Sequence, residues 1–141
     1  MNRIKDSAGG LALQVTKETR DAGLVLENMD GEATRLADVI VYGFDDLLLV
    51  IDTDRVTAAD RAELVASAAR DIKSIYQGSK ASIQISGHGY QVQLPGARDA
   101  GFNLGDKAPV RTVDSVLVIH DGTQRRLAED LITIREEQIE H

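Results

Sequence analysis

Short runs that alternate apolar and polar residues recur along the chain and predict a protein built mainly of β-strands. They include "LQV" at 13–15, "VQL" at 92–94, "VIVYGFDDLLLVID" at 39–52 and "VDSVLVIHDG" at 113–122. The last two are turn-centred pairs of β-rich runs bounded by aspartate, which is typical of hairpins. We therefore expect an α+β chain that is mostly β.

The pattern also predicts an internal repeat. When residues 13–15 are laid on 92–94, one additional residue in the first copy brings "RDAG" at 20–23 onto "RDAG" at 98–101. An apolar residue follows in both copies, and each copy then continues to one of the hairpin runs. The two copies therefore share one plan of strand, short helical turn, glycine, strand, turn and strand.

Glycines mark the turns of each copy. Gly23 and Gly101 are expected to end the short helical turns, because glycine readily takes the left-handed conformation that ends a helix. Tight turns are expected at "MDGE" (29–32) and "LGDK" (104–107). One copy alone would leave open strand edges, so the two copies should pair.

A helix is expected between the copies, over residues 57–78. Thr57 is its predicted N-cap, Asp60 stands three residues later, and Gly78 is its predicted end. Its apolar stripe consists of Leu64, Ala68, Ile72, Ile75 and Tyr76.

A second helix is expected from Thr123 to the end of the chain. Pairs at i, i+4 should support it, Arg125 with Glu129 and Arg126 with Asp130. Its apolar stripe, with further isoleucines on adjoining faces, offers more apolar surface than one side of a small barrel needs. We therefore predict a homo-oligomer interface at Leu127, Leu131 and Ile134.

These elements divide the chain into four segments. They are a first β repeat at 1–56, a connecting helix at 57–80, a second β repeat at 81–122 and a C-terminal helix at 123–141. A chain of 141 residues with 43% hydrophobic residues can bury one ordinary core, or two small cores that lean on each other. We expect a single pseudo-twofold unit to which both copies contribute.

Composition limits the functions that the chain can have. Cysteine is absent, so neither a disulfide nor a thiolate metal site is possible. The first ten residues have no apolar signal core, and the longest apolar run, 47–51, is too short to cross a bilayer. We expect a cytoplasmic protein with no membrane segment.

The net charge of −7 disfavours nonspecific attraction to nucleic acid, which depends on lysine and arginine. DNA binding would therefore require a local basic patch. An acidic surface is also typical of adaptation to a salty cytoplasm, in which case net charge says little about the partner.

The run "VQLPGARDAGFNLGDKAPVRTVDSVLVI" at 92–119 resembles the AbrB-type swapped-hairpin domain. The similarity is carried by Leu94, Pro95, Arg98, Gly101, Phe102, Gly105, Asp106, Val110 and residues 117–119. The tandem arrangement, with a helix after each copy, is similar to the MraZ family of that superfamily. Residues 86–120 carry the likeness well, and residues 6–52 carry it weakly.

This resemblance implies a transcription regulator whose two hairpins interleave into one barrel and whose basic residues contact double-stranded DNA, largely through shape and backbone. No cofactor is implied. The DNA-binding candidates are Arg3, Lys5, Lys17, Arg20, Arg98, Lys107 and Arg111. Each could instead be solvated or paired with a nearby acid, as Arg20 could be with Asp21 and Arg98 with Asp99.

Catalysis is not expected from this sequence. The histidines at 88, 120 and 141 are widely separated, without metal-ligand spacing. The aspartates that flank the run at 47–51 fit turn positions, and no G-x-S-x-G sequence occurs. A non-catalytic oligomerising adaptor on the same fold remains the alternative. The MraZ pattern has a D-x-x-G-R signature at the head of each repeat, and Gly10 and Tyr90 stand where this signature has its arginine. The loss of these two basic residues favours the adaptor.

Overall fold

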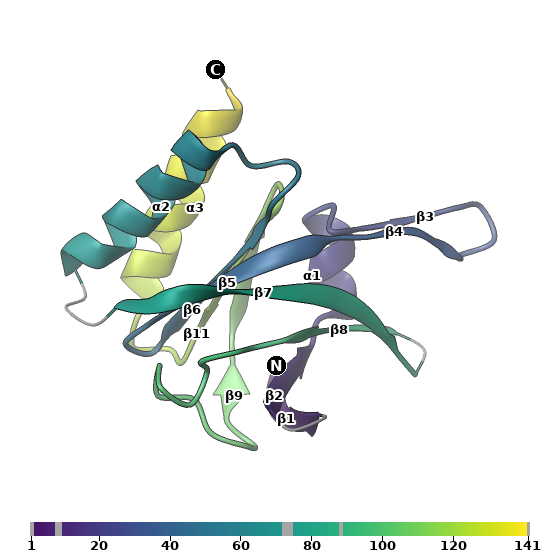
Figure 1. Cartoon of the computed structure of the whole chain (residues 1–141), viewed down its shortest axis with the longest axis horizontal. Coiled ribbons are helices and arrows are strands. Elements are labelled where there is room, and N and C mark those ends of the chain that lie inside the picture. Colours follow the sequence, from purple (N-terminus) through teal and green to yellow (C-terminus); the bar gives the residue numbers. More distant parts are fainter. Residues whose placement is uncertain (1, 8–9, 72–74, 88, 141) are drawn as a thin grey trace.

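A long, curled antiparallel sheet organises the protein, a computed structural model of which describes residues 2–7, 10–71, 75–87 and 89–140 (Figure 1). Its nine strands follow the order β10-β11-β6-β5-β7-β8-β2-β1-β9, and β3 and β4 form a separate pair. The strands are β1 Asn2–Ser7, β2 Gly10–Gln14, β3 Val25–Glu27, β4 Ala33–Leu36, β5 Asp38–Phe44, β6 Leu47–Asp52, β7 Ile75–Ser86, β8 Gly89–Gln93, β9 Lys107–Ala108, β10 Val110–Val113 and β11 Val116–His120. The helices are α1 Thr16–Asp21, α2 Ala58–Asp71 and α3 Arg125–Ile139.

The sheet is nearly closed into a barrel. Its two end strands, β9 and β10, are consecutive in the chain and are separated only by Pro109. Proline has no amide hydrogen to donate to a ladder, which divides this run into two strands. The prediction of a mostly β chain is confirmed.

The two copies alternate across this sheet. Hairpin β5–β6 of the first copy lies between β10–β11 and β7–β8 of the second, and β7–β8 in turn adjoins β2–β1 of the first. Leu13 and Val92, which the sequence alignment superposed, are direct partners across β2 and β8. Strands from residues 1–56 and strands from residues 75–122 are therefore neighbours in the sheet.

The two "RDAG" stretches make matching backbone hydrogen bonds. The amide of Gly23 donates to the carbonyl of Arg20 at 3.1 Å, and the amide of Gly101 donates to the carbonyl of Arg98 at 3.1 Å. Gly23 and Gly101 have positive φ, as predicted from their position at the end of a helical turn.

Each of these turns is also tied to a hairpin of the other copy. The Ser115 amide donates to the Ala22 carbonyl and the Asp46 amide donates to the Ala100 carbonyl, both at 2.7 Å. Ser115 and Asp46 are the non-glycine residues with positive φ in the described chain. The two turns therefore make the same kind of backbone contact with a hairpin distant in the sequence.

Two apolar clusters lie on opposite sides of the sheet. The cluster inside the curl draws on both copies and includes Ile4, Leu13, Leu24, Val50, Ile83, Val92, Phe102 and Leu117. The outer cluster lies between β5, β6, β11 and the helices α2 and α3, which run side by side in Figure 1.

Thr57 caps α2 as predicted, since its hydroxyl accepts the Asp60 amide at 3.1 Å. None of the helices in the described residues is long and apolar enough to span a membrane.

The connecting helix is shorter than the sequence predicted. It ends at Asp71, and Ile75 and Tyr76, placed in its apolar stripe, begin β7 instead. They pair with Phe44 and Gly43 of β5. β-branched and aromatic residues fit a pleated, half-buried surface, so the open edge of β5 decides this segment. Ile72, also assigned to the stripe, lies outside the described residues.

Gly78 is a strand residue, not the end of a helix. A Cβ at this position would lie 2.5 Å from Cε1 of Tyr42 and 2.8 Å from Cγ2 of Ile40. The glycine therefore permits a close approach between β7 and the side chains of β5.

The apolar stripe of α3 is used within the chain. Leu127 and Leu131 are buried in the outer cluster, and Ile134 packs against it while partly buried. The side chains predicted as an oligomer interface therefore cover the protein's own sheet and α2, because this face of the sheet has to be buried. Glu129, expected to pair with Arg125, instead forms an ion pair with Arg111 of β10.

Candidate nucleic-acid interface

The outer side of β9, β1, β2, β8 and the end of β7 carries an unusual set of polar side chains. Ile4, Leu13, Ile83, Val92 and Ala108 point into the inner cluster, so the alternate residues point outward. The outward positions hold Arg3, Lys5, Ser7, Gly10, Ala12, Gln14, Lys80, Ser82, Gln84, Ser86, Gly89, Gln91, Gln93 and Lys107. We call this set the strand face. No acidic residue is in it, although the whole chain carries a charge of −7.

Hydrogen bonds order the side chains of the strand face. The Lys5 ammonium donates to Gln14 Oε1 at 3.0 Å and to Ser86 Oγ at 3.2 Å. The Gln91 amide donates to Gln84 Oε1 at 3.3 Å. These contacts link β1, β2, β8 and β7 across the face and leave further amide donors and acceptors free to bind a ligand.

Arg3 and Lys107 lie together at one side of this face. They are direct partners across β1 and β9, and both are exposed. The Arg3 guanidinium donates to the Gly105 carbonyl at 3.2 Å, and Lys107 has no side-chain partner among the described residues. The structure thus brings three predicted residues, Arg3, Lys5 and Lys107, onto one surface.

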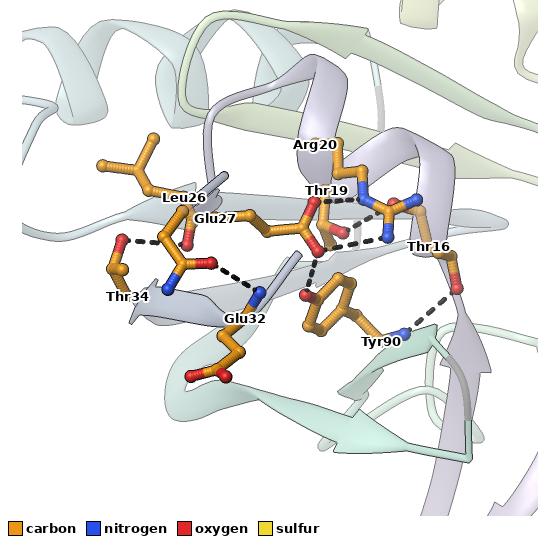
Figure 2. A network of polar contacts seen from close by, with 9 residues as sticks. Thr16, Thr19, Arg20, Leu26, Glu27, Glu32, Thr34 and Tyr90 are labelled. Carbon is orange, nitrogen blue, oxygen red and sulfur yellow. Dashed lines mark hydrogen bonds and ion pairs between the residues drawn. The ribbon is translucent and has the colours of Figure 1, made fainter. Parts of the chain in front are cut away.

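Arg20 lies at the end of α1 in a polar cluster with Glu27 and Tyr90 (Figure 2). Its Nε and Nη2 donate to the two carboxylate oxygens of Glu27 at 2.7 and 3.2 Å. The Tyr90 hydroxyl donates to the same carboxylate at 2.6 Å, and the Arg20 guanidinium lies 5.5 Å from the centre of the Tyr90 ring. The predicted partner of Arg20, Asp21, makes none of these contacts.

These hydrogen bonds shift the pKa values of Glu27, Arg20 and Tyr90. The hydrogen bond from Arg20, followed by that from Tyr90, lowers the pKa of the Glu27 carboxyl. The bond to Glu27 raises the pKa of Arg20, and the same carboxylate, with burial, raises the pKa of Tyr90. Glu27 is therefore charged and Tyr90 stays protonated as a donor at neutral pH.

Glu27 comes from a hairpin that we call the arm, residues 25–36, formed by β3 and β4. Its tip is closed by Asn28, whose side-chain oxygen accepts the amides of Asp30 and Glu32. The arm extends away from the sheet, on the side opposite α2 and α3 (Figure 1). It exists only in the first copy, since the second copy passes through the tight turn at Gly105 to β9.

Arg98 occupies the corresponding turn of the second copy but has a different environment. It is exposed, and no described side chain forms a hydrogen bond or ion pair with it, Asp99 included. A hollow of about 340 Å³ adjoins it, lined in part by Gly10, Leu11 and Pro95. Arg98 is therefore accessible, whereas Arg20 is engaged.

The other two predicted residues have contrasting positions. Lys17 is exposed on α1, close to the strand face, because its neighbour Thr16 accepts hydrogen bonds from Gln14 of β2 and from the Tyr90 amide of β8. Arg111 lies on β10 and is paired with Glu129 of α3. Its guanidinium already has a carboxylate partner on the helix-covered side.

Sequence reasoning missed the glutamines of the strand face and the pairing of Glu27 with Arg20. The alternation of polar residues at 89–93 and 82–86 indicates which positions could face outward, but not that three strands, β2, β7 and β8, place the glutamines side by side. Glu27 could not be assigned, because its contact with Tyr90 joins residues 63 positions apart.

No group of histidine, cysteine, aspartate or glutamate able to hold a metal occurs among the described residues. His120 is buried, and its Nδ1 accepts the Gly122 amide at 3.0 Å. Burial lowers the pKa of its imidazole, which is therefore neutral at neutral pH. His120 therefore has a structural role in the turn before α3.

Comparisons with protein-family models, with characterised proteins and with solved structures give no match for this chain. The resemblance to AbrB-type domains therefore remains a prediction from residues and motifs.

Proposed function

We propose that this protein is a DNA-binding regulator of the AbrB type that contacts double-stranded DNA through the strand face and the two adjoining "RDAG" turns. The observation that carries the proposal is the absence of acidic side chains from the outward positions of the described strands in this face, in a chain with a charge of −7. Basic side chains without acidic neighbours at the same outward positions favour phosphate binding. Asp38 of β5, the direct partner of Ser82, lies at the border of the face.

The proposal includes the swapped-hairpin arrangement. The alternation of hairpins from the two copies along the sheet supports it, as do the matching bonds of the two "RDAG" turns. In this arrangement the two turns are related by a pseudo-twofold axis, so two basic groups can meet one duplex at two places.

The chemistry of the face suits a duplex better than a single strand. Glutamine amides can both donate to and accept from base edges, and lysine and arginine at the margins can neutralise phosphates. Tyr90, the aromatic residue near the face, is buried beneath Glu27 and Arg20 and does not offer a stacking platform.

The test is a titration of duplex DNA over a series of salt concentrations, followed by fluorescence anisotropy. Replacing Arg3 and Lys107 together with alanine should weaken binding and reduce the slope of log K against log salt, by about 0.9 for each lost phosphate contact. Arg126→Ala serves as the control, because Arg126 is an exposed arginine on α3.

Two results would refute the proposal. One is a wild-type protein that binds no genomic fragment at any salt concentration. The other is equal slopes for the double variant, the Arg126 variant and the wild type.

A second candidate function is a non-catalytic interaction module. The arm favours it, because Leu26 and Leu36 are exposed there and Met29, at its tip, has a relative exposure of 104%. Exposed apolar side chains on a projecting hairpin are suited to binding another protein. Loss of binding to a captured protein partner, but not to DNA, on Met29→Ser substitution would favour this candidate.

A further inference from the structure

We propose that Arg20 and Tyr90 form an anion site that the chain's own Glu27 fills in the free protein, and that a phosphate of bound nucleic acid replaces Glu27 there. This inference rests on the proposed DNA-binding function and describes its regulation. The arm would then act as an internal competitor of DNA.

The first argument is that two arginines at equivalent positions differ in their ion pairing. Arg20 and Arg98 have the same place in the "RDAG" turns, whose backbones make matching hydrogen bonds. Arg98 is unpaired among the described residues, and Arg20 is held by two bonds to one carboxylate. The difference arises from the arm, which has no counterpart in the second copy.

The second argument is the form of the Arg20 contact. A guanidinium that binds both oxygens of one carboxylate presents the geometry that also binds two oxygens of a phosphate. The Tyr90 hydroxyl adds a third donor, 2.6 Å from the same carboxylate. A phosphodiester that entered this position would therefore find the donors already oriented.

The third argument is space. A hollow of about 440 Å³ opens directly beside the ion pair and is lined by Arg20, Glu27, Tyr90 and Ile85, together with Glu32, Ala33 and three glycines. A Cβ at Gly31 or Gly87 would meet no atom within 4 Å, so this side of the hollow is open. A backbone phosphate can approach without displacing a core residue.

The fourth argument is that the Arg20–Glu27 contact is accessible to exchange. The Arg20 side chain has a relative exposure of 46%, and exposed ion pairs contribute little to stability. The arm is held separately at its base, where Arg35 binds Asp52 and the Ala37 amide donates to the Leu24 carbonyl. Glu27 can therefore release Arg20 while the arm stays attached.

The main experiment compares Glu27→Gln with Glu32→Gln in the duplex titration over a salt series. Both variants remove one negative charge from the arm, and both side chains line the same hollow, but Glu32 makes no contact with Arg20. Glu27→Gln should bind more tightly than Glu32→Gln and steepen the slope of log K against log salt by about 0.9. Arg20→Ala should abolish this gain in the Glu27→Gln background and have little effect in the wild type.

A measurement on the unchanged protein guards against variants that fail to fold. In NMR spectra, the Arg20 Nε–H should be protected from hydrogen exchange in the free protein and should shift when duplex is added. The Arg98 Nε–H should be unprotected. A shift of the Arg20 Nε–H signal with inorganic phosphate, but none with duplex, would overturn the assignment to nucleic acid.

The outcomes separate this inference from the function on which it rests. If the wild type binds DNA in a manner that depends on Arg98, and Glu27→Gln equals Glu32→Gln, the internal competition is refuted and the DNA-binding function stands. If neither the wild type nor Glu27→Gln binds, both are refuted. Binding by the wild type, with tighter binding by Glu27→Gln than by Glu32→Gln, would support both.

Discussion

Asp52 shows how one buried charge fixes the base of the arm. Its side chain is completely buried at the end of β6, and Arg35 Nη2 lies 2.8 and 3.0 Å from its two carboxylate oxygens. The Asp54 amide donates to the same carboxylate at 2.9 Å. A buried carboxylate is tolerated only when it is paired and hydrogen-bonded in this way.

We expect Arg35→Gln to destabilise the protein by about 3–5 kcal/mol, because it leaves the buried Asp52 carboxylate without its counter-charge. Chemical denaturation measures this loss. Adding Asp52→Asn should restore part of the stability. The control Arg61→Gln, at an arginine with no ion-pair partner among the described residues, should change it by less than about 0.5 kcal/mol. An Arg35→Gln protein as stable as the wild type would contradict the assigned role.

Asp46 gives a pH-dependent prediction. Burial, and then the charges of Asp121 and Asp45, raise the pKa of its carboxyl in the folded state. A raised folded-state pKa means that the stability it contributes is present in acid and is lost as pH rises through that pKa. At neutral pH the charged form of Asp46 is therefore unfavourable.

Asp46→Asn should make the protein slightly more stable than the wild type at pH 7, within about 0.5 kcal/mol. Asparagine tolerates the φ of 60° at this position and carries no charge. The difference should shrink as the pH falls and Asp46 becomes protonated, which thermal unfolding over a pH series will show. A gain that persisted unchanged in acid would exclude the electrostatic cause.

At the scale of elements, α3 illustrates how an apolar stripe can be assigned to the wrong partner. Leu131 has a relative exposure of 0% and lies in the cluster that α2, α3 and the sheet share. Ile139, on the same helix, has a relative exposure of 45%. The stripe therefore stabilises the fold of one chain.

Leu131→Ala should cost about 2–5 kcal/mol, since it opens a cavity in a packed cluster. Ile139→Ala, at an exposed position of the same helix, should be nearly neutral. Denaturant unfolding measures both, and light scattering shows whether either changes the molecular mass. A folded and stable Leu131→Ala protein of lower mass would restore the interface interpretation.

At the scale of the whole molecule, neither copy has an independent core. The inner cluster joins residues of both copies, and β8 and β11 pair with β2 and β6. Separating the copies would expose these strand edges and half of the cluster.

Residues 75–141 expressed alone should therefore be unfolded or self-associated, and adding residues 1–71 should restore a native spectrum. Circular dichroism and two-dimensional NMR will distinguish these states. The prediction fails if residues 75–141 alone give a dispersed spectrum at monomer mass.

The sequence could name many residues of the candidate site, but it could not show which of them lie together. The resemblance to AbrB-type domains implies Arg3, Lys5 and Lys107 as candidates, and the structure brings them together because β1 pairs with β9. Arg111 was selected on the same grounds, yet β10 lies beneath α3 and supplies Glu129 as its partner. Local sequence cannot distinguish these cases, because partner strands and covering helices come from distant parts of the chain.

The sequence by itself determined the alternating strands, the glycine turns and the start of the connecting helix, because each depends on neighbouring residues. Tertiary structure decided that Ile75 and Tyr76 form a strand, since the edge of β5 needed a partner. It likewise decided that Leu131 is core and that Arg20 is held by Glu27. Burial and charge pairing are properties of surfaces that meet only after folding, so a linear pattern names the candidates but does not choose among them.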